Sequence, residues 1–301
     1  MRYVFLLIVL LLLLAYPIDS VRDKLFYSPK ETRMLFVGDL MLDRSVREVS
    51  EEKGADFIFS CVKPLLLKHD TVFANLEGPV TSNKSKSVGS TPGGEGNYTF
   101  TFPLSLPNVL KRHNIMAVSI GNNHIFDFGE EGILETKEAL DGAGIHFAGN
   151  PLDLENTSTA FEVGDERIAL VAFNEFFAPS VEDTLLHIKK YKETSFVVVF
   201  AHWGNEYKTL SSQRQRTWAR SFAEAGADLV IGAHPHVIQE SEVYLGVPIY
   251  YSLGNFIFDQ YWIEDVRKGL GVSVTLKKGE IEKIEEKYFY LERDRRTCPT
   301  N

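Results

Sequence analysis

Three histidines stand close behind short apolar runs of the sequence, and this placement predicts a metal site. His202 follows the run 196–201, while His234 and His236 come after the run 229–231. Imidazole nitrogens are common ligands of Zn, Mn and Fe in proteins. Because His234 and His236 are two residues apart, an extended segment would turn both side chains the same way. The histidines expected to be hydrogen-bonded structural residues are His69, His113, His146 and His187.

Oxygen donors occupy similar positions elsewhere in the chain. Asp39, Glu77 and Asn123 each come after a short apolar run. A carboxylate such as Glu77 can bridge two cations, and two metals roughly 3.5 to 4 Å apart can activate a water and stabilise an in-line displacement. Helix capping is the alternative role for Asp39, and a turn is the alternative for Asn123. The predicted metal ligands are Asp39, Glu77, Asn123, His202, His234 and His236.

Two residues just beyond Asn123 could transfer a proton in such a site. His124 is expected to be the catalytic proton donor, and a purely orienting role is the alternative. Asp127 lies three residues further on and could fix the tautomer of His124, as carboxylates behind metal-site histidines do. Capping of the next helix is the alternative role for Asp127.

Three further polar residues are candidates for contact with a substrate. Arg44 lies just past Asp39, where it could meet either an anionic substrate or a surface carboxylate. Glu206 and Asn255 follow other apolar runs and are predicted to line the same pocket.

These side chains converge if the apolar runs are strands of an α/β fold. Short continuous apolar runs are typical of buried strands. Helical stretches lie between them, such as 132–143 and 213–225, the second with Gly226 as its C-cap. Loops at the carboxyl ends of parallel strands meet at one crevice, where ligands bind. The expected strands are 34–37, 71–74, 116–120, 196–201, 229–231 and 249–251, followed by an antiparallel hairpin of 270–276 and 281–291.

The N-terminus differs in composition from the rest of the chain. Residues 3–18 are uncharged and mostly apolar, so 1–20 is predicted to be a signal anchor, with a cleaved signal peptide as the alternative. Either would place the rest of the chain outside the cytoplasm. Residues 21–32 are a predicted linker, 33–292 the domain, and 293–301 a charged tail that frays. Residues 82–97 are rich in Gly, Ser and Lys and predict a long mobile loop that could be a lid or binding loop.

Charge and cysteine content exclude some classes of function. The net charge of −9 argues against nucleic-acid binding, which needs a basic face. Cys61 and Cys298 belong to no metal-binding motif, so free or buried thiols are expected, and one bridge in an oxidising compartment is the alternative.

Read together, the segments around these residues resemble the bacterial capsule-synthesis protein CapA family, which is associated with poly-γ-glutamate biosynthesis. That family lies within the calcineurin-like metallophosphoesterase superfamily. The resemblance implies a four-layer α/β/β/α sandwich of two mixed sheets, here preceded by an N-terminal hydrophobic helix. The segments that carry the resemblance are 37–42, 74–79, 119–129, 201–204, 226–239 and 251–256.

The resemblance also implies two divalent metal ions, Mn, Zn or Fe. One would be held by Glu77, Asn123, His202 and His234, and the other by Asp39, Glu77 and His236. Met41 stands where the superfamily usually has a histidine, so the second site is expected to be weaker, or completed by water or by Asp43. Glu77 stands in place of the usual aspartate.

Two functions follow from the resemblance. The first is an exported, metal-dependent hydrolase, phosphoesterase-like or amide-directed, that acts in synthesis, modification or export of an anionic cell-surface polymer. The second is a non-catalytic accessory that binds this polymer in the same cleft for a membrane complex of capsule synthesis. In both, the N-terminus holds the protein at the membrane.

Overall fold

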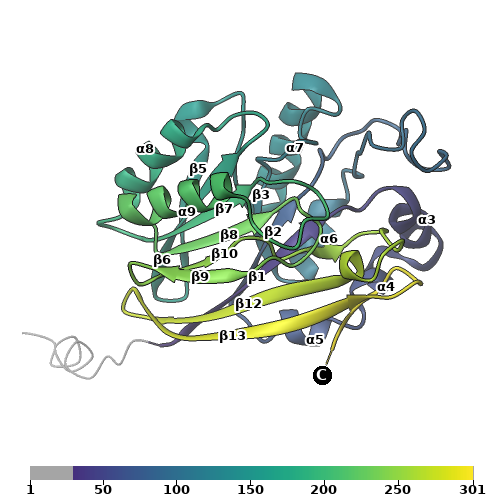
Figure 1. Ribbon diagram of the computed structural model, residues 1–301. Coiled ribbons are helices and arrows are strands. Elements are labelled where there is room, and N and C mark those ends of the chain that lie inside the picture. The colour runs from purple at the N-terminus through teal and green to yellow at the C-terminus, as the bar shows by residue number, and fades with distance from the viewer. Residues whose placement is uncertain (1–29, 301) are drawn as a thin grey trace, which may run out of the picture. The chain divides into compact units, whose positions relative to one another are not determined.

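Two mixed β-sheets lie face to face in the computed structural model, which describes residues 30–300 (Figure 1). The first sheet has the order β14-β13-β12-β1-β2-β3-β4, and β11 pairs with the end of β1. The second has the order β5-β6-β7-β8-β10-β9. Strands of the first sheet are β1 (Thr32–Leu40), β2 (Thr71–Leu76), β3 (Ile115–Ser119), β4 (His146–Ala148), β11 (Asn255–Ile257), β12 (Lys268–Lys277), β13 (Glu280–Leu291) and β14 (Thr297–Pro299). Those of the second are β5 (Ser158–Val163), β6 (Glu166–Asn174), β7 (Phe196–His202), β8 (Leu229–Ala233), β9 (Ser241–Tyr244) and β10 (Val247–Tyr250).

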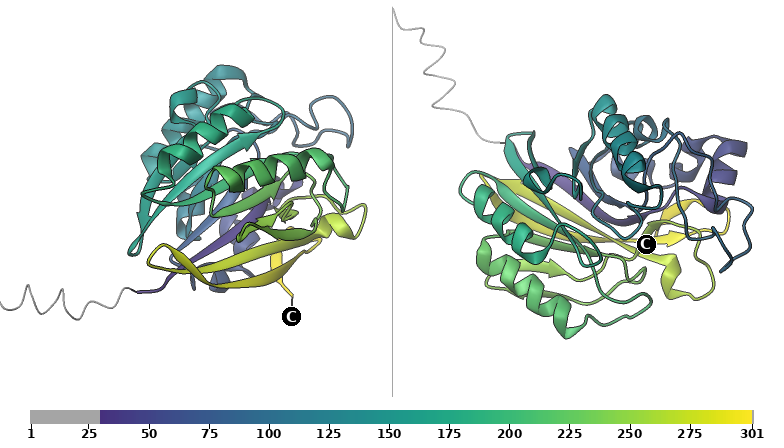
Figure 2. Two further views of the ribbon diagram at one scale, coloured as in Figure 1. Left: turned by 60° about the vertical axis from the view of Figure 1, so that its left-hand side comes forward. Right: turned by 90° about the horizontal axis from the view of Figure 1, so that it is seen from above.

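Helices cover the outer face of each sheet (Figures 1 and 2). The first sheet is covered by α3 (Arg44–Lys53), α4 (Ala55–Phe59), α5 (Lys63–Leu66), α6 (Leu106–Arg112) and α7 (Gly129–Ala143). The second is covered by α8 (Val181–Tyr191) and α9 (Gln213–Ala225). Two short 3-10 helices, η1 (Leu154–Asn156) and η2 (Asp265–Arg267), lie in connections.

The layers follow from alternation of side chains along each strand. On β6, Ile168 and Leu170 point between the two sheets, whereas Ala169 and Val171 point toward α8 and α9. Successive residues of a strand face opposite sides, so a strand that is apolar throughout must be covered on both faces. The order of layers is therefore helices, first sheet, second sheet, helices. The predicted α/β fold with two mixed sheets is confirmed.

The expected strands and helices are present, with small differences at their ends. Strands β1, β2, β3, β7, β8 and β10 correspond to the six apolar runs, and β12 with β13 form the expected hairpin. The second predicted helix is α9, which begins with a capping box of Ser212 and Gln215 and ends at Gly226 with φ 111°. Missing from the prediction were α3 to α6, α8, the hairpin of β5 and β6, and the short strands β4, β9, β11 and β14. Of the missed helices, α4 and α5 are too short, at 5 and 4 residues, to show a helical period.

Parallel pairing sets the register that brings the strand ends together. In the first sheet Asp39 of β1 lies beside Asn75 of β2, which lies beside Ser119 of β3. In the second sheet His202 of β7 lies beside Ala233 of β8. The carboxyl ends of these strands therefore occupy the same edge, as expected for α/β sheets.

The C-terminal residues correct two predictions. Residues 297–299 do not fray, because β14 pairs with β13 over Thr297 to Pro299. Cys61 and Cys298 are not free thiols but form a disulfide across 237 residues of sequence. The pairing of β14 places Cys298 beside Tyr290, and the bridge then reaches the turn between α4 and α5.

Residues 82–97 contain neither helix nor strand, in agreement with a long loop, and they run beside α3 on the right of Figure 1. The predicted anchor, 1–20, and most of the linker lie outside the described residues. Within residues 30–300, no helix has the length and apolar character needed to cross a membrane.

Candidate metal centre

The six predicted ligands meet where the carboxyl ends of strands from both sheets come together. Asp39 is near the end of β1, Glu77 follows β2, and His202 ends β7. Close backbone approach makes this possible. A Cβ at Gly38 would lie 1.8 Å from the carbonyl oxygen of Gly254, so only glycine fits there. The prediction that these strand ends share one site agrees with their positions.

Two groups of ligand atoms lie within this cluster and share one carboxylate. Glu77, His202 and His234 form one group, and Asp39, Glu77 and His236 form the other. Within each group the nitrogen and oxygen atoms all lie within 4.8 Å of one another, and all these side chains are buried. A buried carboxylate common to two such groups is what a bridging ligand requires.

Unsatisfied atoms at the centre agree with cation binding. Glu77 Oε1 and His234 Nδ1 are buried and have no hydrogen-bond partner among the described residues. An unsatisfied buried polar atom costs about 1–3 kcal/mol, so such atoms are uncommon in native proteins. The two atoms belong to one ligand group, and a divalent cation bound there would satisfy both. The residues present therefore fit a divalent metal.

Burial also sets the charge of these ligands. It lowers the pKa of His202 well below 6.5 and that of His234 to about 3, with further lowering by the neighbouring histidines. Both imidazoles are therefore neutral at neutral pH, which is the form that binds metals. Burial raises the pKa of Glu77 well above 4.5, and the carboxylates of Asp39 and Glu206 add to this. A bound cation would favour the charged carboxylate and so act against both effects.

Asn123 joins the first group through its side-chain oxygen. Asn123 Oδ1 lies 2.8 Å from His202 Nε2. The contact with His202 agrees with the prediction that Asn123 shares a metal site with Glu77, His202 and His234.

Asn75 lies at the middle of the centre, and the sequence reasoning missed it. Its Nδ2 donates to Asp39 Oδ1 at 2.8 Å and lies 3.5 Å from Glu77 Oε2 and 3.2 Å from His202 Nδ1. Asn122 in turn donates to Asn75 Oδ1 at 3.2 Å. One amide group therefore contacts ligands of both groups. The signal was available, because Asn75 precedes Glu77 by two residues and side chains two apart on a strand share a face.

Met41 and Asp43, the two residues considered near the second metal site, have other surroundings. Met41 packs in the core between the first sheet and its helices, and its Sδ accepts a hydrogen bond from the backbone N of Asp43 at 3.1 Å. Asp43 Oδ2 accepts from the backbone N of Thr101 at 2.8 Å. Neither Met41 nor Asp43 belongs to a ligand group. Each group therefore has three such donors, and Asn123 lies beside the one with His202.

His124 and Asp127 form the predicted pair. His124 Nδ1 lies 2.9 Å from Asp127 Oδ2, which also accepts the backbone N–H of Phe100 at 2.7 Å. The other ring nitrogen, Nε2, lies 4.0 Å from Glu77 Oε1 and so faces the metal centre. Asp127 thus acts on His124 and does not cap the following helix, whose N-cap is Phe128.

The backbone around His234 and His236 differs from the expectation of an extended segment. Both residues have positive φ, 96° and 58°, which is uncommon for residues with a side chain. His234 N donates to Asp39 Oδ2 at 3.3 Å, which helps to hold this conformation. The turn places the two rings in different ligand groups instead of side by side on one face. Strain of this kind is concentrated at functional sites.

The three predicted substrate contacts have different surroundings. Asn255 is a correction, because it is fully buried and its amide donates to Gln260 Oε1 and Val266 O, at 3.0 and 2.9 Å. Its Oδ1, 3.0 Å from His236 Nδ1, therefore accepts the proton of that ring and leaves His236 Nε2 for a metal. Arg44 Nη2 lies 2.6 Å from Asp259 Oδ1, and the residue lines a cleft. Glu206 is exposed, and its charge contributes to the raised pKa of Glu77.

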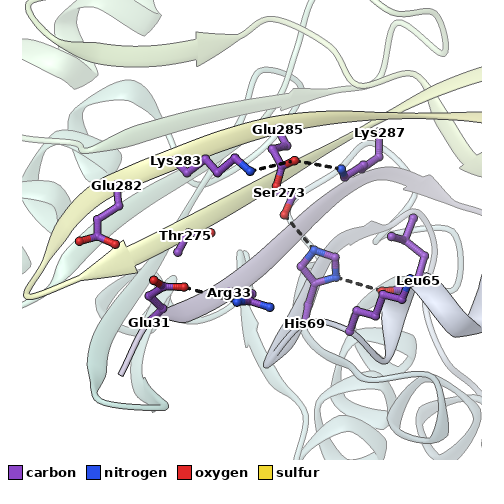
Figure 3. Close-up of a pocket in the computed structure, with 11 residues that line it drawn as sticks. Glu31, Arg33, Leu65, His69, Ser273, Thr275, Glu282, Lys283, Glu285 and Lys287 are labelled. Atoms are coloured by element: carbon purple, nitrogen blue, oxygen red, sulfur yellow. Dashed lines mark hydrogen bonds and ion pairs between the residues drawn. The ribbon is translucent and has the colours of Figure 1, made fainter. Parts of the chain in front are cut away.

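A separate hollow of about 610 Å³ lies over the first sheet and contains none of the predicted site residues (Figure 3). His69 spans its floor from Leu65 O to Ser273 Oγ, at 3.0 and 2.9 Å. Lys283 and Lys287 both pair with Glu285. Most of its charged side chains pair with one another, and it holds neither ligand group, so size alone does not make it a site.

Comparisons with known proteins agree with this geometry. Residues 33–260 match the family described as bacterial capsule synthesis protein PGA_cap. The chain is 34% identical over 287 residues to the PGA biosynthesis protein CapA of Bacillus subtilis (strain 168), covering 86% of this chain and 71% of that protein. It is 33% identical over 251 residues to the capsule biosynthesis protein CapA of Bacillus anthracis, covering 76% and 60%. Part of each relative therefore extends beyond the match.

A solved structure has the same fold. A phosphatase of Mycoplasma pneumoniae superposes with a TM-score of 0.52 at 12% identity, over 87% of this chain and 95% of the other. At this identity the likeness concerns the fold alone.

Proposed function

The chain belongs to the bacterial capsule synthesis protein PGA_cap family, and from this we propose that it acts in the synthesis, modification or export of an anionic cell-surface polymer such as poly-γ-glutamate. We propose further that it does so by metal-dependent hydrolysis. The names of the two relatives, which refer to PGA and to capsule biosynthesis, support the first part. The clustered ligands support the second.

The observation that carries the hydrolase proposal is the buried, shared carboxylate of Glu77 with its unsatisfied Oε1. On this proposal one divalent ion is held by Glu77, Asn123, His202 and His234, and a second by Asp39, Glu77 and His236. The candidate ions are Mn, Zn and Fe. Bound there, divalent metal supplies Lewis-acid polarisation of a substrate oxygen.

His124 would donate the proton that the leaving group needs. Its Nδ1 is held by Asp127, so its Nε2 is the atom that faces the centre. Asp127 is itself fixed by the backbone of Phe100, which keeps the imidazole from rotating. A proton donor held within reach of a reacting group contributes about 10²- to 10⁴-fold in rate.

The place of action is also a proposal. The uncharged segment 3–18 and the disulfide of Cys61 with Cys298 both support a location outside the cytoplasm, with the N-terminus as a membrane anchor. There the protein would meet its polymer and the membrane subunits of a synthesis complex.

The test combines metal analysis with activity. Full-length protein and its His124→Ala and His234→Ala variants are analysed for bound Mn, Zn and Fe, and assayed on p-nitrophenyl phosphodiesters and γ-glutamyl anilides. We expect full metal in His124→Ala with a rate about 10²- to 10⁴-fold lower, because only the proton donor is missing. His234→Ala should lose the ion of its own ligand group and the activity. His146→Gln, in which a histidine stacked on Phe161 away from the ligand groups is replaced, is the control and should keep both.

A second function is favoured by one observation. The group with Asp39 and His236 has no contribution from Met41 or Asp43, and a weakly held ion suits binding better than turnover. The protein would then be a non-catalytic accessory that holds the polymer for the synthesis complex. Full metal content with no activity on any substrate would support this function and contradict hydrolysis. Absence of bound metal in the wild type would contradict both.

A further inference from the structure

A cleft beside the metal centre has the features of a ligand site. It encloses about 450 Å³ between the start of α3, the loop residues 87–98, residues 259–262 and Arg295. The loop predicted at 82–97 thus forms one of its walls. The chain segments that meet here are far apart in sequence, so the cleft depends on the complete fold.

Arg44 lies between this cleft and the metal centre. Its guanidinium lies 5.1 Å from the ring centre of Phe100 and 5.4 Å from that of Phe258. The Phe100 ring is 4.3 Å from His124, and the Phe258 ring is 4.8 Å from His236. Phe100 therefore lies between the arginine and the proposed proton donor, and Phe258 lies between the arginine and a proposed metal ligand.

The donors of Arg44 are not all used within the protein. Its side chain is only 10% exposed, and Nη2 pairs with Asp259 Oδ1 at 2.6 Å. Its buried Nε has no acceptor among the described residues. The other oxygen of Asp259 accepts hydrogen bonds from the backbone N and the Oγ of Ser45. Asp259 therefore does not form a bidentate pair with the guanidinium. A guanidinium whose hydrogen-bonding capacity is only partly used can bind a carboxylate through charge-assisted hydrogen bonds.

The backbone of Arg44 is strained. Arg44 is the first residue of α3 and has φ 48°, in the left-handed region that residues with a side chain rarely adopt. Such conformations persist where the fold holds them and are concentrated at ligand sites. Here the strain accompanies a side chain that turns toward the cleft instead of solvent.

The walls of the cleft supply apolar surface beside the charge. Trp262 and Tyr98 are 57% and 59% exposed, although large aromatic side chains are usually buried. Arg295 contributes a second guanidinium, which lies 4.8 Å from the ring of Tyr261 and donates to Ser45 Oγ. Two carboxylates, Glu48 and Asp259, also line the cleft, and Asp259 is paired with Arg44 and Ser45. A polymer chain whose carboxylates alternate with short methylene segments matches the two guanidinium groups and the aromatic faces beside them.

We infer that Arg44 binds a carboxylate of an anionic polymer strand that lies in this cleft, and thereby places the next bond of the strand at the metal centre. This inference rests on the proposed function and adds the cleft that would hold the polymer and the residue that would bind its carboxylate. Trp262 and Tyr98 would line the path of the polymer chain, and Arg44 would set which of its bonds lies at the metal centre.

The test measures binding without turnover. Full-length protein with His124→Ala, loaded with metal, is titrated with a short γ-linked glutamate oligomer and with the same oligomer whose free carboxylates are converted to carboxamides. Arg44→Ala should weaken binding of the acidic oligomer by about 10- to 100-fold, because a charge-assisted hydrogen-bonded pair is lost. Binding of the amide form should stay unchanged. Arg44→Lys should fall between, since lysine keeps the charge without the fork.

The matched control is Arg47→Ala, three residues along α3. Arg47 pairs with Glu51 and Thr101 O and does not line the cleft. This variant should bind both oligomers as the parent does. If Arg44→Ala does not fold, as thermal melting would reveal, Arg44→Lys gives the answer, together with Trp262→Ala on the exposed wall. Trp262→Ala should weaken both oligomers several-fold.

Three results would overturn the inference. Equal affinity of the Arg44 variants and the parent for the acidic oligomer is the first, and an equal loss for acidic and amide oligomers is the second. The third is a metal-loaded parent that binds neither oligomer. The metal analysis is independent of all three, so failure of this inference can be told from failure of the metal centre.

Discussion

At the scale of residues, the candidate centre depends on side chains that orient the ligands. Asn75 contacts Asp39, Glu77 and His202, and Asn255 fixes the ring of His236. Neither can be identified as an orienting residue from its type, because asparagine also serves in turns and caps. The ligands themselves were easier to predict, since histidine and carboxylate at strand ends have few other reasons to be buried.

Asn75→Ala should weaken metal binding without removing any ligand. We expect a loss of about 10- to 100-fold in affinity, the usual effect of deleting a partner that orients metal ligands. Titration of metal-free protein with Mn or Zn, followed by calorimetry, would measure it. Asn108→Ala, on the exposed face of α6, is the control and should bind metal as the wild type does. Unchanged affinity in Asn75→Ala would show that its hydrogen bonds do not support the centre.

At the scale of elements, the sequence predicted the strands best and the short helices least. Strands such as β7 are apolar throughout because both faces are covered, so their pattern is visible in the sequence alone. The turn at His234 could not be predicted, because positive φ at a histidine is imposed by packing and by the bond to Asp39. The predicted substrate contact of Asn255 differs from its buried position for a similar reason. Its partners, Gln260 and Val266, lie in a segment whose position only the fold determines.

The packing of α6 gives a prediction about pH. His113 follows α6, is fully buried, stacks 4.3 Å from Phe59, and has its pKa lowered from 6.5 mainly by burial. Burial disfavours protonation of this ring in the folded protein, and the carboxylate of Asp56, 3.3 Å from Nε2, offsets only part of this effect, whereas the unfolded chain protonates it below about pH 6.5. The unfolded state then binds more protons, so the unfolding free energy falls as pH drops below that value.

His113→Phe keeps an aromatic ring at this position but removes its titration. The unfolding free energy of the variant should therefore depend less steeply on pH between about 7 and 5. Urea unfolding at several pH values would measure both slopes. An identical slope in the two proteins would contradict a lowered pKa at His113, whatever the absolute stabilities are.

At the scale of the whole molecule, the two sheets and the centre depend on each other. Asp39 and Glu77 come from the first sheet, and His202 and His234 from the second. A cation that binds them links the two sheets directly. The sequence allowed this convergence to be predicted in outline, but the cleft could not be predicted, because its walls come from four separate segments.

Metal removal should therefore lower the stability of the entire domain. At a free metal concentration of 100 times Kd, binding adds about 2.7 kcal/mol per site to the unfolding free energy. Thermal melting with and without a chelator should show one cooperative transition that shifts as a unit. His234→Ala is the comparison and should shift less, because it keeps only the group of Asp39, Glu77 and His236. A chelator that shifts this variant as much as the wild type would mean that the stabilising ion binds elsewhere.

The disulfide between Cys61 and Cys298 has a further consequence for the loop 82–97, which lies inside the ring that it closes. A protease that cuts this loop would leave two fragments still joined covalently. The nicked protein would keep the cleft wall formed by α3 and that formed by Arg295 on one linked body. At the proposed location outside the cytoplasm, a single cut would thus not release either half until the bridge is reduced.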